Sequence, residues 1–234
     1  MVGIIPARGG SKAIPRKNLA PLGGRSLLAW TCVAARTASS LTRVVVSTDD
    51  EEIAREAERC GVAAPFRRSA KLAGDAAPTL PVIQEAVTFL ERSATRVEAV
   101  VVLQPTSPFR RAEHIDGAVR LLFETGADSV VSVVEVPHQF NPMSVMRIDQ
   151  GRLVPFLEGQ GTGTLRRQDK PAVYARNGAA VYAIRRDVLM GGSLFGHDCR
   201  ALVMSGRDSI DIDGPEDLAL AEALLHAEAG RGRA

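Results

Sequence analysis

The chain of 234 residues is long enough for one domain with a sizeable core, and with 45% hydrophobic and 24% charged residues it has an ordinary globular composition. Its net charge of +2 and aromatic content of 4% argue against nucleic-acid and membrane partners. Three scattered cysteines without metal spacing indicate reduced thiols. The sequence has no signal-peptide pattern and no apolar run of about 18 residues, so we expect a cytoplasmic protein.

Strand and helix patterns alternate along the first half of the chain. Apolar runs predict strands at residues 2–7, 43–50, 97–108 and 127–136. Helical periodicity predicts helices at residues 26–38, 50–61, 79–94 and 112–126. The run at 97–108 is continuously apolar and is expected to be central. The alternation predicts an α/β fold with a mostly parallel, twisted sheet flanked by helices.

The pattern breaks at about residues 137–171, which are rich in turn signals. Two short alternating pieces flank Gln150 and Gly151 and predict a hairpin. We interpret this segment as an arm inserted into a single domain of residues 1–228. The α/β pattern then resumes, with a last helix beginning at Pro215, and residues 229–234 are expected to form a disordered tail.

The stretch after the first predicted strand combines glycines with positive charge. Gly9 and Gly10 allow backbone N–H groups to approach a ligand closely. The surrounding basic residues are Arg8, Lys12, Arg16 and Lys17. Together they suit a polyphosphate, although neither common phosphate fingerprint is present. The alternative is a solvated turn, but a position directly after the first strand favours a ligand site.

Acidic and basic residues also follow the second predicted strand. Asp49 and Asp50 either bind metal or ribose or cap the next helix, and capping is favoured for Asp50. The following loop contains Arg67, Arg68, Lys71 and Asp75. It is either an ordinary surface loop or the completion of a phosphate site.

Polar residues end the central strand. Gln104 follows an apolar run, with Thr106 and Ser107 beside it, and two prolines restrict the loop. Since buried polar side chains need partners, Gln104 is interpreted as a group that reads a ligand.

Two carboxylates alternate with isoleucines near the end of the chain. In an extended segment, Asp211 and Asp213 would point to the same side and repel each other unless a cation lies between them. Mg²⁺ suits such a pair beside phosphates. The alternative, that Asp213 caps the helix at Pro215, is equally open on these residues alone. The four histidines share no ligand spacing, which disfavours zinc.

These motifs, in this order, resemble those of the CMP-sialic acid synthetases (acylneuraminate cytidylyltransferases), whose relatives act on other nonulosonic acids and on Kdo. The matching stretches cover roughly residues 3–225 and include IIPARGGSKAIPRKNL, LQPTSPFR, RRQDKP, NGAAVY and DSIDIDGPEDL. The resemblance implies a Rossmann-like nucleotidyltransferase fold and a homodimer whose arms reach over the neighbour's site. It also implies that the anomeric hydroxyl of a keto-sugar acid attacks the α-phosphate of CTP, with Mg²⁺ as cofactor.

The resemblance also assigns roles to residues of this chain. The nucleotide would be held by Ala7, Arg8, Gly9, Gly10, Ser11, Lys12, Lys17, Asn18, Arg68 and Asp75. The sugar acid would be held by Gln104, Thr106, Ser107, Arg167 and Asn177, with Arg167 paired to its carboxylate. Mg²⁺ would be held by Asp211 and Asp213. Catalysis would depend on positioning and charge neutralisation by Arg8, Lys12, Lys17, Asp211 and Asp213.

Two departures from the family pattern fall on the sugar side. The arm lacks a lysine that sialic acid enzymes often carry, and Ala175 stands where many have an arginine, with Arg176 following. The alternatives are therefore Kdo or another sugar, including a sugar 1-phosphate with a different nucleotide, or a non-catalytic nucleotide-binding module. A dehydrogenase is disfavoured because the dinucleotide fingerprint is missing.

Overall fold

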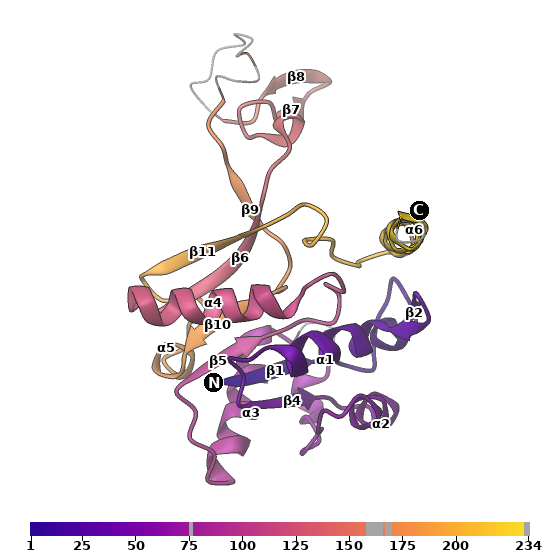
Figure 1. Ribbon diagram of the computed structural model, residues 1–234. Coiled ribbons are helices and arrows are strands. Elements are labelled where there is room, and N and C mark those ends of the chain that lie inside the picture. The colour runs from indigo at the N-terminus through magenta and orange to yellow at the C-terminus, as the bar shows by residue number, and fades with distance from the viewer. Residues whose placement is uncertain (75–76, 158–165, 167–169, 232–234) are drawn as a thin grey trace.

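The computed structural model describes residues 1–74, 77–157, 166 and 170–231, and a seven-stranded sheet forms its centre (Figure 1). The strand order is β11-β6-β10-β5-β1-β4, and β9 also pairs with β6. The strands are β1 (Val2–Pro6), β4 (Arg43–Ser47), β5 (Ala99–Val102), β6 (Ser129–Glu135), β9 (Tyr174–Arg176), β10 (Tyr182–Arg185) and β11 (Cys199–Met204).

Most of these strands run in one direction. β1 is parallel to β4 and β5, and β11 is parallel to β6. β9 and β10 run antiparallel to β6, and β10 also runs antiparallel to β5. The predicted mostly parallel sheet is confirmed, and β5 is an inner strand whose four residues are all buried. The reversal at β9 and β10 was not indicated by the sequence pattern.

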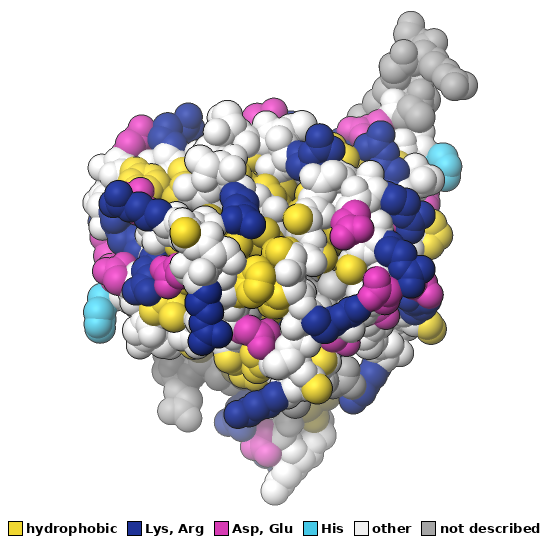
Figure 2. Space-filling view, turned by 90° about the horizontal axis from the view of Figure 1, so that it is seen from below, with side chains coloured by type: hydrophobic (Ala, Val, Ile, Leu, Met, Phe, Trp, Pro, Cys, Tyr) yellow, Lys and Arg dark blue, Asp and Glu magenta, His cyan; other side chains and the backbone are white. Residues whose placement is uncertain are grey.

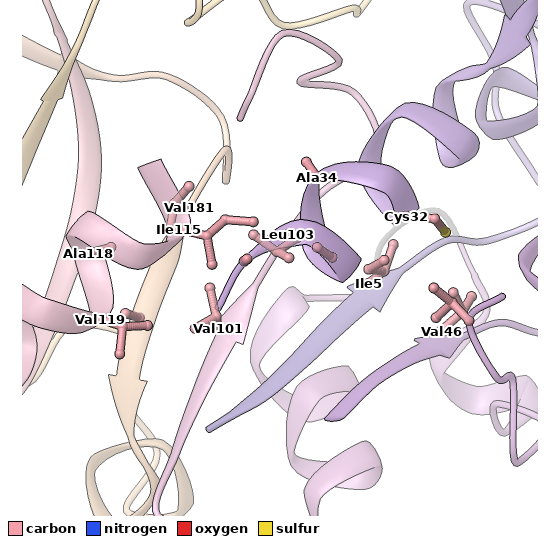
Figure 3. Packing of buried hydrophobic residues seen from close by; sticks show 14 of the residues in the cluster. Ile5, Cys32, Ala34, Val46, Val101, Leu103, Ile115, Ala118, Val119 and Val181 are labelled. Carbon is pink, nitrogen blue, oxygen red and sulfur yellow. The ribbon is translucent and has the colours of Figure 1, made fainter. Parts of the chain in front are cut away.

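Helices cover both faces of the sheet. The hydrophobic cluster on one face includes residues of α1 (Leu27–Thr37), α2 (Glu51–Arg59) and α4 (Ala112–Thr125). The cluster on the other face includes residues of α3 (Thr79–Arg92) and α5 (Arg186–Met190). Successive strand residues supply the two clusters in turn, as the pleat requires: Ile4 belongs to one and Ile5 to the other. Figure 3 shows the cluster around Ile5, Val101 and Ile115.

The segment after β6 leaves the sheet and forms the arm. It contains the short helix η3 (His138–Phe140) and a hairpin of β7 (Met146–Asp149) and β8 (Arg152–Pro155), which stands away from the sheet in Figure 1. The turn is made by Gln150 and Gly151, both with positive φ, as a two-residue hairpin requires. The predicted hairpin is confirmed.

The last helix, α6 (Pro215–Arg231), packs beside the small hairpin of β2 (Pro21–Leu22) and β3 (Arg25–Ser26). It continues to residue 231, so the tail expected at 229–234 is helical at its start, and residues 232–234 lie outside the described part. Within the described residues, no helix combines the length and the apolar character that a membrane crossing requires. At the end opposite the arm, basic and acidic side chains are intermixed over the surface (Figure 2).

Candidate active site

A cavity of about 300 Å³ opens at the carboxyl ends of β1 and β5. The chain passes from β1 to β4 on one side and later to β5 on the other, so this is the point where strand order reverses. We call it the first cavity. Its wall includes eight of the predicted site residues: Arg8, Gly10, Ser11, Lys17, Asn18, Arg68, Gln104 and Thr106. The wall also contains the apolar residues Leu72, Ala77 and Val82, and Thr79 at the start of α3, none of which the sequence motifs indicate.

The glycine loop is fixed by the two acids that follow β4. The Gly9 N–H donates to Asp49 Oδ1 at 3.2 Å, so Asp49 shapes the loop. Asp50 Oδ1 accepts the N–H groups of Glu52 and Ile53, which confirms its role as the cap of α2. A Cβ at Gly9 would lie 2.7 Å from Asp50 Oδ2, so the close approach of the loop to Asp50 requires glycine here.

Two hydrogen bonds hold Arg8 in place. Asn18 donates to the Arg8 carbonyl at 2.9 Å, and Arg8 Nη1 donates to the Gly74 carbonyl at 3.1 Å. Ala7 is fully buried, and its N–H donates to the Ser47 carbonyl, which extends the pairing of β1 with β4. Lys12 is exposed and does not line the first cavity. Hydrogen bonds therefore fix the loop, which places the basic side chains of Arg8 and Lys17 at the cavity wall.

Arg68 is a nearly buried cation at the cavity, with 5% of its surface exposed. Its Nε donates to Ser47 Oγ at 3.1 Å, and its Nη2 donates to the Ser47 carbonyl. Burial lowers the pKa of Arg68, and the negative charges of Asp49 and Glu85 oppose that change. Asp75, predicted to lie in the same loop, is outside the described residues.

Lys17, in the short helix η1 (Lys17–Leu19), connects the first cavity to the two late carboxylates. Its Nζ donates to the Ile212 carbonyl at 2.9 Å and lies 3.2 Å from Asp213 Oδ1. The Asp213 side chain is 80% exposed, whereas Asp211 is partly buried. Burial raises the pKa of Asp211, the negative charge of Asp213 raises it further, and the positive charge of Lys17 opposes the rise.

The cap of α6 comes from a residue other than Asp213. Asp217 Oδ2 accepts the N–H groups of Asp213 and Gly214, at 2.9 and 2.8 Å. In the described part of the chain, the Asp213 carboxylate accepts from Lys17 and from no N–H group of α6, so the capping alternative for Asp213 is wrong. In the part of the chain that the structure describes, no three His, Cys, Asp or Glu side chains form a ready metal cluster. A donor set of two carboxylates still fits Mg²⁺, which usually takes its other ligands from phosphate and water.

A second cavity adjoins the first and shares Gln104 and Thr79 with it. Its volume is about 600 Å³, and its wall includes Arg176, Tyr182 and Phe195. The Arg176 guanidinium lies 5.1 Å from the centroid of the Phe195 ring. Burial raises the pKa of Tyr182, and the charge of Arg176 opposes the rise. Gln104 thus stands between two cavities, one with several cations and one with a single arginine above aromatic rings.

Two of the described residues predicted to bind the sugar, Asn177 and Ser107, do not line either cavity. Asn177 is buried, with Oδ1 accepting from Ser132 Oγ at 2.7 Å and Nδ2 donating to Ser209 Oγ at 2.8 Å. Ser107 is fully buried, with its Oγ 3.5 Å from Asp211 Oδ1. Both residues support the walls from behind, and their contact with substrate stays a prediction. Arg167 lies outside the described residues.

Sequence reasoning noted Arg176 but assigned it no role, and it did not consider Tyr182 or Phe195. The NGAAVY motif was the available signal, since it places Tyr182 on β10 a few residues after Arg176. The missing information was the break between β9 and β10, which turns both side chains toward the second cavity.

Comparison with known proteins agrees with this geometry. The chain matches the cytidylyltransferase family over residues 2–197. It is 35% identical to the CMP-N,N'-diacetyllegionaminic acid synthase of Legionella pneumophila over 227 residues, 96% of each chain. It is 33% identical to the N-acylneuraminate cytidylyltransferase of Escherichia coli, covering 94% of this chain and 51% of that one.

A solved structure of similar fold is that of CMP:2-keto-3-deoxy-manno-octonic acid synthetase complexed with CTP. The two share 19% sequence identity, with a TM-score of 0.72 over 97% of this chain and 98% of the other. At this identity the likeness concerns the fold alone. Together, the sequence matches and the site at the carboxyl ends of β1 and β5 show that the chain belongs to the cytidylyltransferase family, among the CMP-sialic acid synthetases.

Proposed function

We propose that this protein joins CTP to the anomeric hydroxyl of a nonulosonic acid and releases a CMP-sugar and pyrophosphate. The observation that carries the proposal is the pair of cavities that meet at Gln104. The first cavity has cations suited to a triphosphate, and the second has an arginine and aromatic rings suited to a sugar acid. The relatives named as legionaminic acid and acylneuraminate enzymes support the substrate class.

In the proposed reaction, the hydroxyl oxygen of the sugar acid forms a bond to the α-phosphorus of CTP. The bond from that phosphorus to the bridging oxygen of pyrophosphate breaks, and the hydroxyl proton is lost. Arg8, Lys17 and Arg68 offset the negative charge of the triphosphate, with Lys12 close in the chain. The protein itself forms no covalent bond to either substrate in this reaction, so the rate of transfer depends on how the two substrates are aligned.

Asp211 and Asp213 are the residues that would hold Mg²⁺. When bound, the ion would neutralise phosphate charge and polarise the reacting phosphorus. The position of Lys17, between the first cavity and the Asp213 carboxylate, supports this assignment because it brings the acids to the phosphate end. The hydroxyl of Ser107, 3.5 Å from Asp211 Oδ1, would orient the Asp211 carboxylate.

The sugar carboxylate is proposed to bind on the second-cavity side. The Arg176 guanidinium lies 5.1 Å from the centroid of the Phe195 ring at the wall of the second cavity, and an arginine can hold a carboxylate through a bidentate contact. Arg167 remains a candidate by resemblance. A single carboxylate-binding arginine beside Gln104 would orient the anomeric hydroxyl toward the first cavity.

The arm supports a proposed homodimer in the reducing cytoplasm. Ile148 and Leu153 face each other across the β7–β8 hairpin and are 77% and 71% exposed. Phe140 and Phe156 are also exposed, at 64% and 58%. Apolar side chains gathered on a projecting hairpin are typical of a protein interface. A second copy of the chain is the partner that the family resemblance implies.

The direct test is incubation with CTP, Mg²⁺ and a panel of nine-carbon and eight-carbon keto-sugar acids. We expect pyrophosphate release with at least one nonulosonic acid, and mass spectrometry should identify the CMP-sugar. Turnover with Kdo alone would assign Kdo as the substrate in place of a nonulosonic acid. Turnover only with a sugar 1-phosphate and another nucleotide, or CTP binding without turnover on the whole panel, would overturn the proposal.

A further inference from the structure

Arg110, in the loop between β5 and α4, is almost completely buried, with 2% of its surface exposed. Its three hydrogen bonds all go to neutral oxygens. Among the described residues, no carboxylate forms an ion pair with it, and its Nε has no hydrogen-bond partner. A buried guanidinium without a paired acid is expensive to maintain, so its presence calls for an explanation.

The three bonds join three separate elements. Nη1 donates to the Gln104 carbonyl at 3.0 Å and to the Ala180 carbonyl at 2.9 Å. Nη2 donates to Thr31 Oγ1, in α1, at 2.6 Å. One rigid group therefore ties the end of β5 to the chain between β9 and β10, and anchors both to a helix. This is the wall in which Gln104 separates the two cavities.

The loop that Arg110 closes also reaches the late carboxylates. The Thr106 carbonyl accepts the Ile212 N–H at 2.7 Å, between the two aspartates. The Gln104 N–H donates to the Ala179 carbonyl at 3.0 Å, beside the bond from Arg110 to Ala180. The loop of residues 104–110 thus contacts both the phosphate end and the sugar end of the site. The position of its backbone sets the separation between the two ends.

We propose that Arg110 is a positioning residue, whose buried guanidinium fixes Gln104 relative to the Asp211–Asp213 segment and so aligns the acceptor hydroxyl with the α-phosphorus. Arg110 touches neither substrate, since it lines neither cavity. Burial lowers the pKa of Arg110 to about 9, so the guanidinium keeps its charge at neutral pH.

The test is Arg110→Lys, which keeps a positive charge but cannot reach three acceptors with one rigid fork. We expect kcat to fall at least tenfold, while the Kd for CTP, measured by calorimetry without the sugar acid, stays within threefold. A purely structural role would lower Tm without changing kcat per folded molecule. Folded Arg110→Lys enzyme with kcat within twofold of wild type would overturn the inference. A parallel loss of CTP affinity would also overturn it.

Arg185→Lys is the matched control. Arg185 donates to the Ala127 carbonyl at 2.8 Å, far along the same sheet from both cavities, and its substitution should leave kcat unchanged. If Arg110→Lys does not fold, Thr31→Val is used instead. It removes the hydrogen bond from Arg110 Nη2 to Thr31 Oγ1 without changing the charge. We then expect a three- to tenfold fall in kcat at constant CTP affinity, and an unchanged kcat would overturn the inference. The inference rests on the proposed function, which fails separately if wild-type protein gives no turnover.

Discussion

The Lys17 ammonium lies 3.2 Å from Asp213 Oδ1 and 2.9 Å from the Ile212 carbonyl oxygen, so it joins the start of the chain to its last loop. Since Asp213 is 80% exposed, this ion pair adds little to stability. Its value lies in placing one cation beside both the first cavity and the late carboxylates.

Replacing Lys17 with Met should weaken CTP binding about ten- to a hundredfold, the effect of losing one charged hydrogen bond to a phosphate. Tm should change by no more than a few degrees, because the Asp213 side of the ion pair is 80% exposed. Calorimetric titration with CTP and a thermal scan measure the two quantities. Arg59→Met, which removes an exposed charge from α2, is the control. Equal CTP affinity in both variants would contradict the role of Lys17.

Asp211→Asn should abolish most turnover while making the metal-free protein more stable at neutral pH. Burial raises the pKa of Asp211, so the folded state holds this proton more tightly than the unfolded state. The ionised carboxylate therefore costs stability as pH rises from its ordinary pKa through the raised value, and that cost persists at neutral pH. The neutral amide of the asparagine side chain does not carry this free-energy cost.

The measurements for Asp211→Asn are pyrophosphate release in Mg²⁺ and Tm in EDTA. Glu124→Gln, an exposed acid on α4, is the matched control and should change neither. Normal turnover by Asp211→Asn would refute the assignment of Asp211 to the metal. A lower Tm in EDTA would show that the carboxylate is not strained by burial.

Gly9→Ala should destabilise the protein by about 1–3 kcal/mol, the usual cost of forcing an extra methyl group into a filled space. The new Cβ would lie 2.7 Å from Asp50 Oδ2 and 2.9 Å from Asp50 Cβ, and Asp50 also caps α2. Urea unfolding measures the loss. Gly206→Ala is the control, because nothing lies within 4 Å of its Cβ position and its φ is not positive. Equal stability of the two variants would mean that the loop adjusts freely.

The double variant Ile148→Asp, Leu153→Asp should convert the proposed dimer into a monomer with an unchanged circular dichroism spectrum. These side chains form one cross-strand pair on the arm, and charges there oppose burial against another copy. Light scattering after gel filtration gives the mass. Leu220→Asp, at a 52% exposed position on α6, should leave the mass unchanged. A wild-type protein that is already monomeric would refute the dimer.

Much of the nucleotide side could be predicted from the sequence because it depends on local rules. A glycine loop after the first strand and a polar residue after the apolar run 97–108 both mark strand ends, and parallel strands bring such ends together. Asp50 was predicted as a cap from its place before a helix, and the structure confirms it.

The rest depends on tertiary contacts that no local pattern contains. Asp213 and Asp217 are both suited to capping α6, and only the path of the loop decides that Asp217 does so. Asn177 has the chemistry of a ligand-binding residue, yet both ends of its amide are bound within the protein. Arg110 is one of two adjacent arginines, and nothing in the sequence tells which one is buried.

The interruption between β9 and β10 separates the pairing of the arm with β6 from the pairing of β10 with β6. β9 pairs with Val133–Glu135 and β10 with Ser129–Val131, so each piece finds its register on β6 independently. Gly178, with a φ of +68° and Asp211 close to its Cβ position, stands in the gap between them. Insertions or substitutions in the arm are therefore expected to leave the register of β10 on β6 unchanged.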